Sequence, residues 1–271
     1  MPVVVTRPAA EGLAWCAELQ RRGFDAVPLP LIAITPLPPE GRATLHAAWR
    51  RLGDCRAVMF VSAAAVQNFF DAAPPGSAWP AGTRAWSPGP GTSAVLRACG
   101  APADAIDAPA ADAPQLDSES LWDAVGAQVR PGDAVLIVRG AQQDHDDPTG
   151  TGHGRAWMAD RLAGAGARVS VVAAYRRGPP AWNADERARA ASLARAGTTW
   201  LFSNSEAVGH LFALLPEVAD ALRQGTAIAT HARIAEAARA AGFARVAAAR
   251  PGFDGVAAAI SAAGPSIEST G

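Results

Sequence analysis

The 271-residue sequence contains no lysine, so arginine supplies all 24 of its basic residues. Without lysine the chain cannot form a Schiff base with a carbonyl substrate, and it cannot build a Walker-type phosphate loop. Anions must instead be bound by arginine, backbone N–H groups and hydroxyls. A biased genome composition is the simplest explanation of the missing lysine, because alanine is abundant, but both exclusions hold whatever the cause.

Cysteine and charge are also scarce. Cys16, Cys55 and Cys99 lie far apart and are odd in number, which favours a reduced cytoplasmic protein over a disulfide framework or a thiolate metal site. Charged residues make up 18% of the chain and the net charge is −1, so nucleic acid is not expected as the main partner. The first residues show no basic segment typical of a signal peptide, and no apolar run approaches a membrane span, so no membrane association is expected.

Short apolar runs alternate with segments rich in alanine, leucine and arginine along the whole sequence. The runs 2–6, 57–62 and 134–140, for example, each come before a segment with helical periodicity. This alternation indicates βαβ units and parallel sheets buried on both faces. One helix is expected over about 9–22, with Leu13, Cys16 and Ala17 on one face. With 49% hydrophobic residues, the chain can form two α/β domains or one large one.

An internal repeat favours two domains. Residues 60–70 (FVSAAAVQNFF) resemble residues 202–212 (FSNSEAVGHLF), and residues 85–100 resemble residues 227–242 at the same offset of 142. A constant offset over both blocks suggests two copies of one α/β domain. A weaker similarity links VVVTRP, which contains Arg7, to VLIVRG, which contains Arg139. Its offset is 132, so we expect it to lie outside the main register.

Two proline-bounded runs, 27–38 and 168–180, interrupt the alternation. Proline biases the residue before it toward extended geometry, so both runs are expected to be strands or connectors. We therefore expect a discontinuous first domain, residues 1–34 and 174–271, with a second domain, residues 37–171, inserted into it. The two runs would cross between the domains and form a hinge beside a cleft.

The stretch 84–100 satisfies a dinucleotide-binding fingerprint, because Gly89, Gly91 and Ala94 have the required spacing and Asp107 follows. The corresponding loop of the other copy, within 228–236, has no glycine, so two copies used alike would not need the fingerprint. The two loops share a position between a strand end and a helix start, where open α/β sheets bind ligands. We therefore favour an anionic ligand approaching the backbone closely over a nucleotide.

Polar residues follow four of the expected strands. Hydroxyls, helix N-terminal amides and a guanidinium could all meet an anion there. Ordinary N-capping by serine and threonine is the alternative, and repetition of the pattern at four strand ends weighs against it. The residues in question are Ser62, Thr92, Ser203, Asn204, Thr230, His231 and Arg233.

The polar loop 141–154 carries possible metal ligands. These are Asp144, His145, Asp146, Asp147 and His153. Nothing in their glycine-rich spacing fixes a coordination geometry, so we expect a solvated loop and no metal site.

Tyr175 is the only tyrosine in the chain and lies in the second proline-bounded run, before Arg176 and Arg177. One interpretation is an interface aromatic whose hydroxyl is solvated. The other is a phenol at the cleft, able to donate a proton or a hydrogen bond.

The ordered motifs resemble the uroporphyrinogen-III synthase family across nearly the whole chain. They are VVVTRP, PLPLIAITPL, VMFVSAAAV, AWSPGPGTSAVLRACG, VLIVRG, AAYRR, WLFSNSEAV and RIAEAARAAGF. The resemblance implies two flavodoxin-like α/β domains joined by a two-stranded linker. It implies a lyase of tetrapyrrole (haem-type) biosynthesis that cyclises hydroxymethylbilane to uroporphyrinogen III, inverting the terminal pyrrole ring and losing water. No metal or organic cofactor is expected, and a cytoplasmic monomer is the default.

The resemblance also implies roles for residues. Tyr175 corresponds to a tyrosine that assists departure of the hydroxyl. The residues expected to contact the substrate are Arg7, Ser62, Gly89, Gly91, Thr92, Arg139, Ser203, Asn204, Thr230, His231 and Arg233. Transient contact with the pathway enzyme before or after it is left open. The alternative function is a non-catalytic binding or sensor protein of the same fold, which would have no use for Tyr175.

Overall fold

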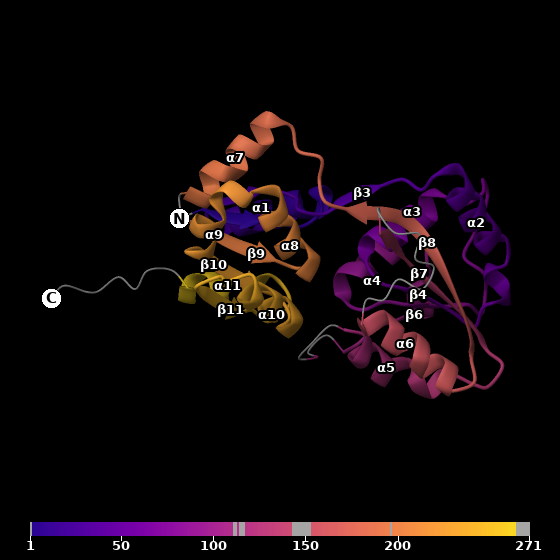
Figure 1. Cartoon of the computed structure of the whole chain (residues 1–271). Coiled ribbons are helices and arrows are strands. Elements are labelled where there is room, and N and C mark those ends of the chain that lie inside the picture. Colours follow the sequence, from indigo (N-terminus) through magenta and orange to yellow (C-terminus); the bar gives the residue numbers. More distant parts are fainter. Residues whose placement is uncertain (1, 111–112, 114–116, 143–152, 196, 264–271) are drawn as a thin grey trace. The chain divides into compact units, whose positions relative to one another are not determined.

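The computed structural model covers the whole chain and describes residues 2–110, 113, 117–142, 153–195 and 197–263 (Figure 1). The chain forms two compact units. The first unit consists of Met1–Ala33 and Pro179–Gly271, and the second of Ile34–Gly178. The first unit therefore resumes at Pro179, whereas the repeat places this boundary at 174. Each unit is described by itself below.

The first unit is built on a five-stranded sheet in which every pairing is parallel. The strand order is β11-β10-β9-β1-β2. Its elements are β1 (Val3–Val5), α1 (Ala9–Arg21), β2 (Ala26–Pro28), α7 (Ala184–Arg195), β9 (Thr199–Phe202), α8 (Ser205–Leu214), α9 (Ala219–Arg223), β10 (Thr226–Ala229), α10 (Ala232–Ala240), β11 (Arg245–Ala248) and α11 (Phe253–Ala263), with a 3₁₀ turn at Pro216–Val218.

The second unit contains a six-stranded sheet of order β3-β8-β7-β4-β5-β6. Its elements are β3 (Ala33–Thr35), α2 (Pro39–Arg50), β4 (Ala57–Phe60), α3 (Ala63–Asp71), β5 (Arg84–Trp86), α4 (Pro90–Ala98), β6 (Ile106–Asp107), α5 (Ser118–Val125), β7 (Ala134–Gln142), α6 (His153–Gly164) and β8 (Arg168–Gly178), with 3₁₀ turns at Leu52–Asp54, Ala103–Ala105 and Gly126–Gln128. The expected α/β class with parallel sheets is confirmed.

The same strand order occurs in both units once β3 is set aside. In the first unit the order β2-β1-β9-β10-β11 is the flavodoxin-like 2-1-3-4-5 arrangement, and β8-β7-β4-β5-β6 reproduces it in the second. The strands β7 and β8 come last in the second unit but take the places of β1 and β2. The two units are therefore circular permutations of one topology.

The pairing register corrects one expectation from the sequence. Val4 pairs with Trp200 in the first unit, and Leu136 pairs with Val58 in the second. Trp200 and Val58 are related by the offset of 142, and Val4 and Leu136 by the offset of 132. The weaker similarity thus lies within the common register, and permuted strand order causes its different offset.

Alternating residues of the strands pack on opposite faces of each sheet. Val3, Val5, Leu201 and Ile228 pack with α1 and α11 on one face of the first sheet. In the second sheet, Val58 and Phe60 belong to a core with α2, α3 and α4, whereas Ala57 and Met59 face α5 and α6. Burial on both faces explains why these strands are continuous apolar runs.

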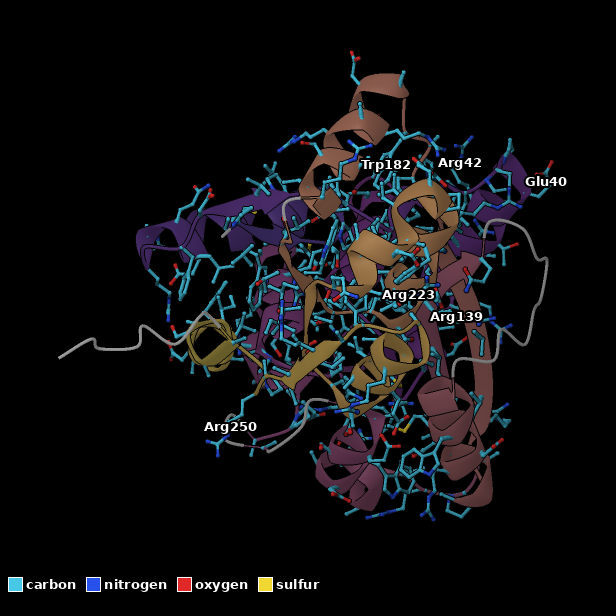
Figure 2. The ribbon with its side chains drawn as sticks, turned by 60° about the vertical axis from the view of Figure 1, so that its left-hand side comes forward. Glu40, Arg42, Arg139, Trp182, Arg223 and Arg250 are labelled. Atoms are coloured by element: carbon cyan, nitrogen blue, oxygen red, sulfur yellow. The ribbon has the colours of Figure 1, made fainter. Side chains whose placement is uncertain are left out.

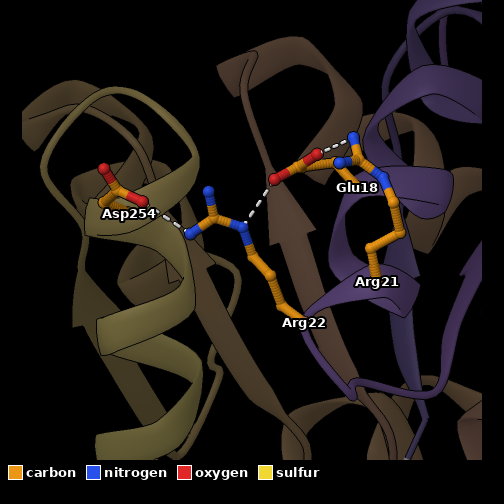
Figure 3. Close-up of polar contacts among 4 residues, drawn as sticks. All are labelled: Glu18, Arg21, Arg22 and Asp254. Atoms are coloured by element: carbon orange, nitrogen blue, oxygen red, sulfur yellow. Dashed lines mark hydrogen bonds and ion pairs between the residues drawn. The ribbon is translucent and has the colours of Figure 1, made fainter.

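Surface ion pairs join α1 to α11 in the first unit (Figure 3). Arg22 contacts Glu18 at 2.7 Å and Asp254 at 2.5 Å, and Arg21 contacts the second oxygen of Glu18. The buried face of α1 consists of Gly12, Cys16 and Leu19. Leu13 was expected on the same face as Cys16. It does not belong to the buried face, because it is 61% exposed.

The two proline-bounded runs differ from each other. Residues 27–38 contain the end of β2, which belongs to the first sheet, and β3, which belongs to the second. Residues 168–178 form one long strand, β8, between β3 and β7 in the second sheet. No helix in the described part of the chain is long and apolar enough to span a membrane.

Candidate functional site

The carboxyl ends of the parallel strands carry the candidate residues of both units. Open α/β sheets bind ligands there, at the point where the strand order reverses. In the second unit this point lies between β7 and β4, and the residues at it include Arg139, Gly140 and Ser62. In the first unit it lies between β1 and β9, next to Arg7 and Ser203.

In the second unit, Ser62 and Tyr175 meet directly. The Ser62 Oγ and the Tyr175 hydroxyl are 3.3 Å apart, and either can donate the hydrogen bond. Ser62 also caps α3, since its Oγ accepts a hydrogen bond from the Ala65 N–H at 3.2 Å. The N-capping interpretation therefore applies to Ser62, while its functional role stays a prediction that the contact with Tyr175 makes specific.

The ring of Tyr175 is packed into the core of its unit, and the residue is only 4% exposed. It therefore does not match the expectation of an interface aromatic with a solvated hydroxyl. Arg139, labelled in Figure 2, is also buried, with 7% exposure, although it is charged. Gly140 follows it on β7 and lies opposite Tyr175.

Two serines, Ser87 and Ser93, hold the glycine-containing loop of the second unit. Ser93 Oγ donates to Ser87 Oγ at 3.0 Å, and Ser87 Oγ donates to the Gly89 carbonyl at 2.8 Å. These bonds fix the turn that starts α4. The next residues differ in access: Gly91 is exposed with open space around its Cα, while Thr92 is buried with 7% exposure.

Asp107, the acidic residue that follows the fingerprint stretch, is paired with Arg84. The Arg84 Nε donates to Asp107 at 2.8 Å, and a second Arg84 nitrogen contacts the other carboxylate oxygen. These hydrogen bonds raise the pKa of Arg84 above its ordinary value. In the structure Asp107 thus joins the neighbouring strands β5 and β6.

In the first unit, Arg7 follows β1, and its half-buried side chain is 18% exposed. Burial lowers the pKa of Arg7, and Glu11, at 3.1 Å, partly offsets this. The guanidinium also stacks on Trp15, 4.3 Å from the ring centroid. The Arg7 Nε is buried without a hydrogen-bond partner among the described residues. Glu11 and Trp15 are site residues that sequence reasoning missed, although their i+4 and i+8 spacing places them near Arg7.

Capping accounts for part of the polar set in the first unit. Asn204, rather than Ser203, caps α8, because its Oδ1 accepts from the Glu206 N–H at 2.8 Å. His231 caps α10 by accepting from the Arg233 N–H at 3.1 Å. Thr230 Oγ1 donates to the Phe202 carbonyl at 3.4 Å, which links the ends of β10 and β9.

Ser203 and Arg233 lie at the same strand ends. Ser203 is half-buried and Arg233 is exposed. Arg7, Ser203, Asn204, Thr230, His231 and Arg233 all belong to the first unit, and Ser62, Gly89, Gly91, Thr92, Arg139 and Tyr175 to the second.

Neither metal ligands nor reactive thiols gather in the described part of the chain. No group of three or more histidine, cysteine, aspartate or glutamate residues is placed to hold a metal among the described residues. Asp144, His145, Asp146 and Asp147 lie outside the described residues, as does the side chain of His153. Burial raises the pKa values of Cys16, Cys55 and Cys99, which disfavours a thiolate nucleophile at any of them.

Comparison with known proteins gives one consistent result. A family model described as uroporphyrinogen-III synthase HemD matches residues 14–258. A mutant uroporphyrinogen III synthase from the extremely thermophilic bacterium Thermus thermophilus has a TM-score of 0.55 at 17% identity, with 97% of this chain and 98% of that chain covered. A uroporphyrinogen-III synthetase from Helicobacter pylori has a TM-score of 0.48 at 12% identity, with 97% and 98% covered. No curated protein matches the chain.

Proposed function

Since the chain belongs to the uroporphyrinogen-III synthase family, it is an enzyme of tetrapyrrole biosynthesis, and we propose that it acts as a cyclising hydro-lyase with Tyr175 as its acid. The substrate is hydroxymethylbilane, and the product is uroporphyrinogen III. The contact between Tyr175 and Ser62 at 3.3 Å is the observation that carries the proposal.

The first step breaks the C–O bond of the terminal hydroxymethyl group. The electron pair leaves with the oxygen, which needs a proton to depart as water. The adjoining pyrrole nitrogen stabilises the positive charge that remains on carbon. The pyrrole ring at the other end then attacks the cation through the α-carbon that already bears its methylene bridge, which forms a spiro intermediate. The original bond from this α-carbon to the methylene bridge then breaks, and the methylene carbon bonds to the other α-carbon of the same ring, so the ring is inverted as the macrocycle closes. A proton lost from carbon restores the acid, so the net change is cyclisation with loss of one water.

Tyr175 can supply that proton and Ser62 can stabilise the phenolate left behind. After the transfer, the Ser62 O–H donates to the phenolate oxygen while Ser62 Oγ still accepts from the Ala65 N–H. The positive end of α3 thus supports the developing negative charge through one hydroxyl. Tyr175 is 4% exposed, so the proposal requires that its hydroxyl be uncovered when substrate binds.

The acetate and propionate groups of the substrate need cationic or N–H donors. Arg7 suits this role because its buried Nε has no partner among the described residues and its charge is only partly balanced by Glu11. Exposed Arg233 and the accessible backbone at Gly91 offer further donors. Held at several points, a flexible chain of four rings presents the correct carbon for attack, which is catalysis by proximity.

An isomer assay tests the proposal. Purified protein is mixed with hydroxymethylbilane, and the uroporphyrinogen isomers are separated by chromatography and compared with a protein-free reaction. We expect the type III isomer to dominate with protein and the type I isomer to form spontaneously without it. If the protein gives only the type I isomer, the lyase assignment is wrong and a non-catalytic binding protein of this fold is favoured.

A further inference from the structure

The pairing of β7 with β8 is irregular next to Tyr175. Arg139 pairs with Ala173, but the next residue, Gly140, pairs with Tyr175, so Ala174 is an extra residue on β8. A bulge of this kind re-aims a side chain, because strand residues otherwise alternate between the two faces. Val172 and Ala174 lie in one core cluster, and Tyr175 joins the same cluster, although strict alternation would send it to the opposite face.

The ring of Tyr175 lies directly against the backbone of Gly140. A Cβ built on Gly140 would be 2.5 Å from Tyr175 Cε2, 2.7 Å from Cζ and 3.0 Å from the hydroxyl oxygen. All three distances fall at or below the closest approach of real Cβ atoms, so any side chain at position 140 must displace the ring. The atoms affected are those at the hydroxyl end of the ring, which is the end that meets Ser62.

We propose that Gly140 is a positioning residue for Tyr175: its missing side chain and the adjacent bulge set the phenol oxygen within hydrogen-bonding distance of Ser62. A glycine in a strand interior costs stability, because it adds backbone entropy and packs nothing. Here the space it leaves is filled by the one tyrosine of the chain. The catalytic part of this inference rests on the proposed function, whereas the placement of the ring does not.

The first test reads the position of the phenol without using activity. Because Tyr175 is the only tyrosine, protein labelled with 3-fluorotyrosine gives one ¹⁹F NMR resonance. The variant Gly140→Ala is expected to shift this resonance. The matched control is Gly164→Ala, at the end of α6 in the same unit, where an added Cβ meets nothing within 4 Å. If Gly140→Ala leaves the resonance unshifted, the proposed packing of the Tyr175 ring against Gly140 is wrong.

The second test separates positioning from general damage. Gly140→Ala is expected to lower kcat by about 10- to 100-fold with little change in KM, and Gly164→Ala to change neither, since loss of a general acid costs about 10²-fold or more. In a Tyr175→Phe background, Gly140→Ala should reduce kcat further by less than about twofold. An unchanged kcat in Gly140→Ala, or a full further loss in the Tyr175→Phe background, overturns the positioning role.

A third measurement covers the case in which Gly140→Ala fails to fold. Leucine at 175 has no atoms at the Cε, Cζ or hydroxyl positions, so the clash disappears. The double variant Gly140→Ala/Tyr175→Leu should then unfold at a urea concentration no lower than that of Tyr175→Leu alone, because alanine in a strand costs less backbone entropy than glycine. A lower midpoint for the double variant overturns the proposal that position 140 contacts the Tyr175 ring, because the methyl group of Ala at position 140 would then clash with another residue. Absence of synthase activity in the wild type would refute the proposed function and leave the NMR and unfolding results valid.

Discussion

In both units one strand at the point where the strand order reverses has an arginine at an equivalent register position: Arg7 follows β1, and Arg139 lies within β7. The strands around these arginines differ greatly in length. β1 and β2 have 3 residues each, whereas β7 has 9 and β8 has 11. Gly140 takes the position that Pro8 has in the first unit, where that chain turns into α1, and the extra length of β7 and β8 pairs Gly140 with Tyr175 there.

This difference places different chemical groups at equivalent strand positions of one topology. The first unit keeps a cation at its strand end, with a half-exposed carboxylate, Glu11, as its ion-pair partner. The second unit extends the equivalent strands and adds a phenol and a hydroxyl in contact. We therefore expect substitutions in the second unit to affect the chemical step and those in the first to affect substrate binding.

The largest effect is expected for Tyr175→Phe, which removes one hydroxyl and keeps the ring in the core. The rate of type III formation should fall about 10²-fold, the low end for loss of a general acid, with KM nearly unchanged. The far-ultraviolet circular dichroism spectrum and the unfolding midpoint serve as controls for the fold. Unchanged turnover would show that the phenol is not the required acid and would remove the main contrast between the units.

A smaller effect, of the opposite kind, is expected for Arg7→Gln. One charged hydrogen bond contributes about 1.5–3 kcal/mol, so KM should rise about 10- to 100-fold while kcat changes little. The matched control is Arg21→Gln in the neighbouring helix α1, because Arg21 is 75% exposed. Initial rates measured over a range of hydroxymethylbilane concentrations separate the two constants. A fall in kcat with constant KM would place Arg7 in the chemical step.

Part of this comparison is accessible from the sequence. The constant offset of 142 identifies two copies, because β4–α3 and β9–α8, and β5–α4 and β10–α10, occur in the same chain order in both units. Linear spacing alone places the similarity between VVVTRP and VLIVRG outside that register. Strand pairing, which brings β7 to the position of β1, cannot be obtained from linear spacing.

The site itself is only partly predictable. Ser62 and Tyr175 are both candidates from the sequence, but they are 113 residues apart and nothing in their spacing predicts a direct contact. The role of Gly140 depends on a bulge between Arg139 and Gly140, which is a property of two paired strands and not of either sequence alone. In the sequence analysis, capping by serine and threonine is the alternative to ligand binding at the strand ends, whereas the caps in the first unit are Asn204 and His231.

A third prediction concerns Ser62, which has two partners. Ser62→Ala should lower the free energy of unfolding by about 1 kcal/mol through loss of the α3 cap. It should also lower kcat several-fold, because the phenolate loses a donor. Asp117→Ala is the control, since Asp117 caps α5 by accepting from the Ser120 N–H at 2.9 Å. That variant should lose similar stability in urea unfolding while retaining kcat. An equal kcat in the two variants would show that Ser62 acts only as the N-cap of α3.

The smallest effects are expected for two ion pairs, one in each unit. Arg84 and Asp107 share two contacts and are half-buried, with side-chain exposures of 27% and 16%, so Asp107→Asn should cost about 1 kcal/mol. The Asp254 side chain is 94% exposed, and its pair with Arg22 is open to water and salt (Figure 3). Asp254→Asn should leave the unfolding midpoint within experimental error at about 0.15 M salt, because charges at the surface are screened there. If instead Asp254→Asn destabilised the protein as much as Asp107→Asn, the contact between α1 and α11 would be structural, and the assumption that exposed pairs contribute little would be wrong for the first unit.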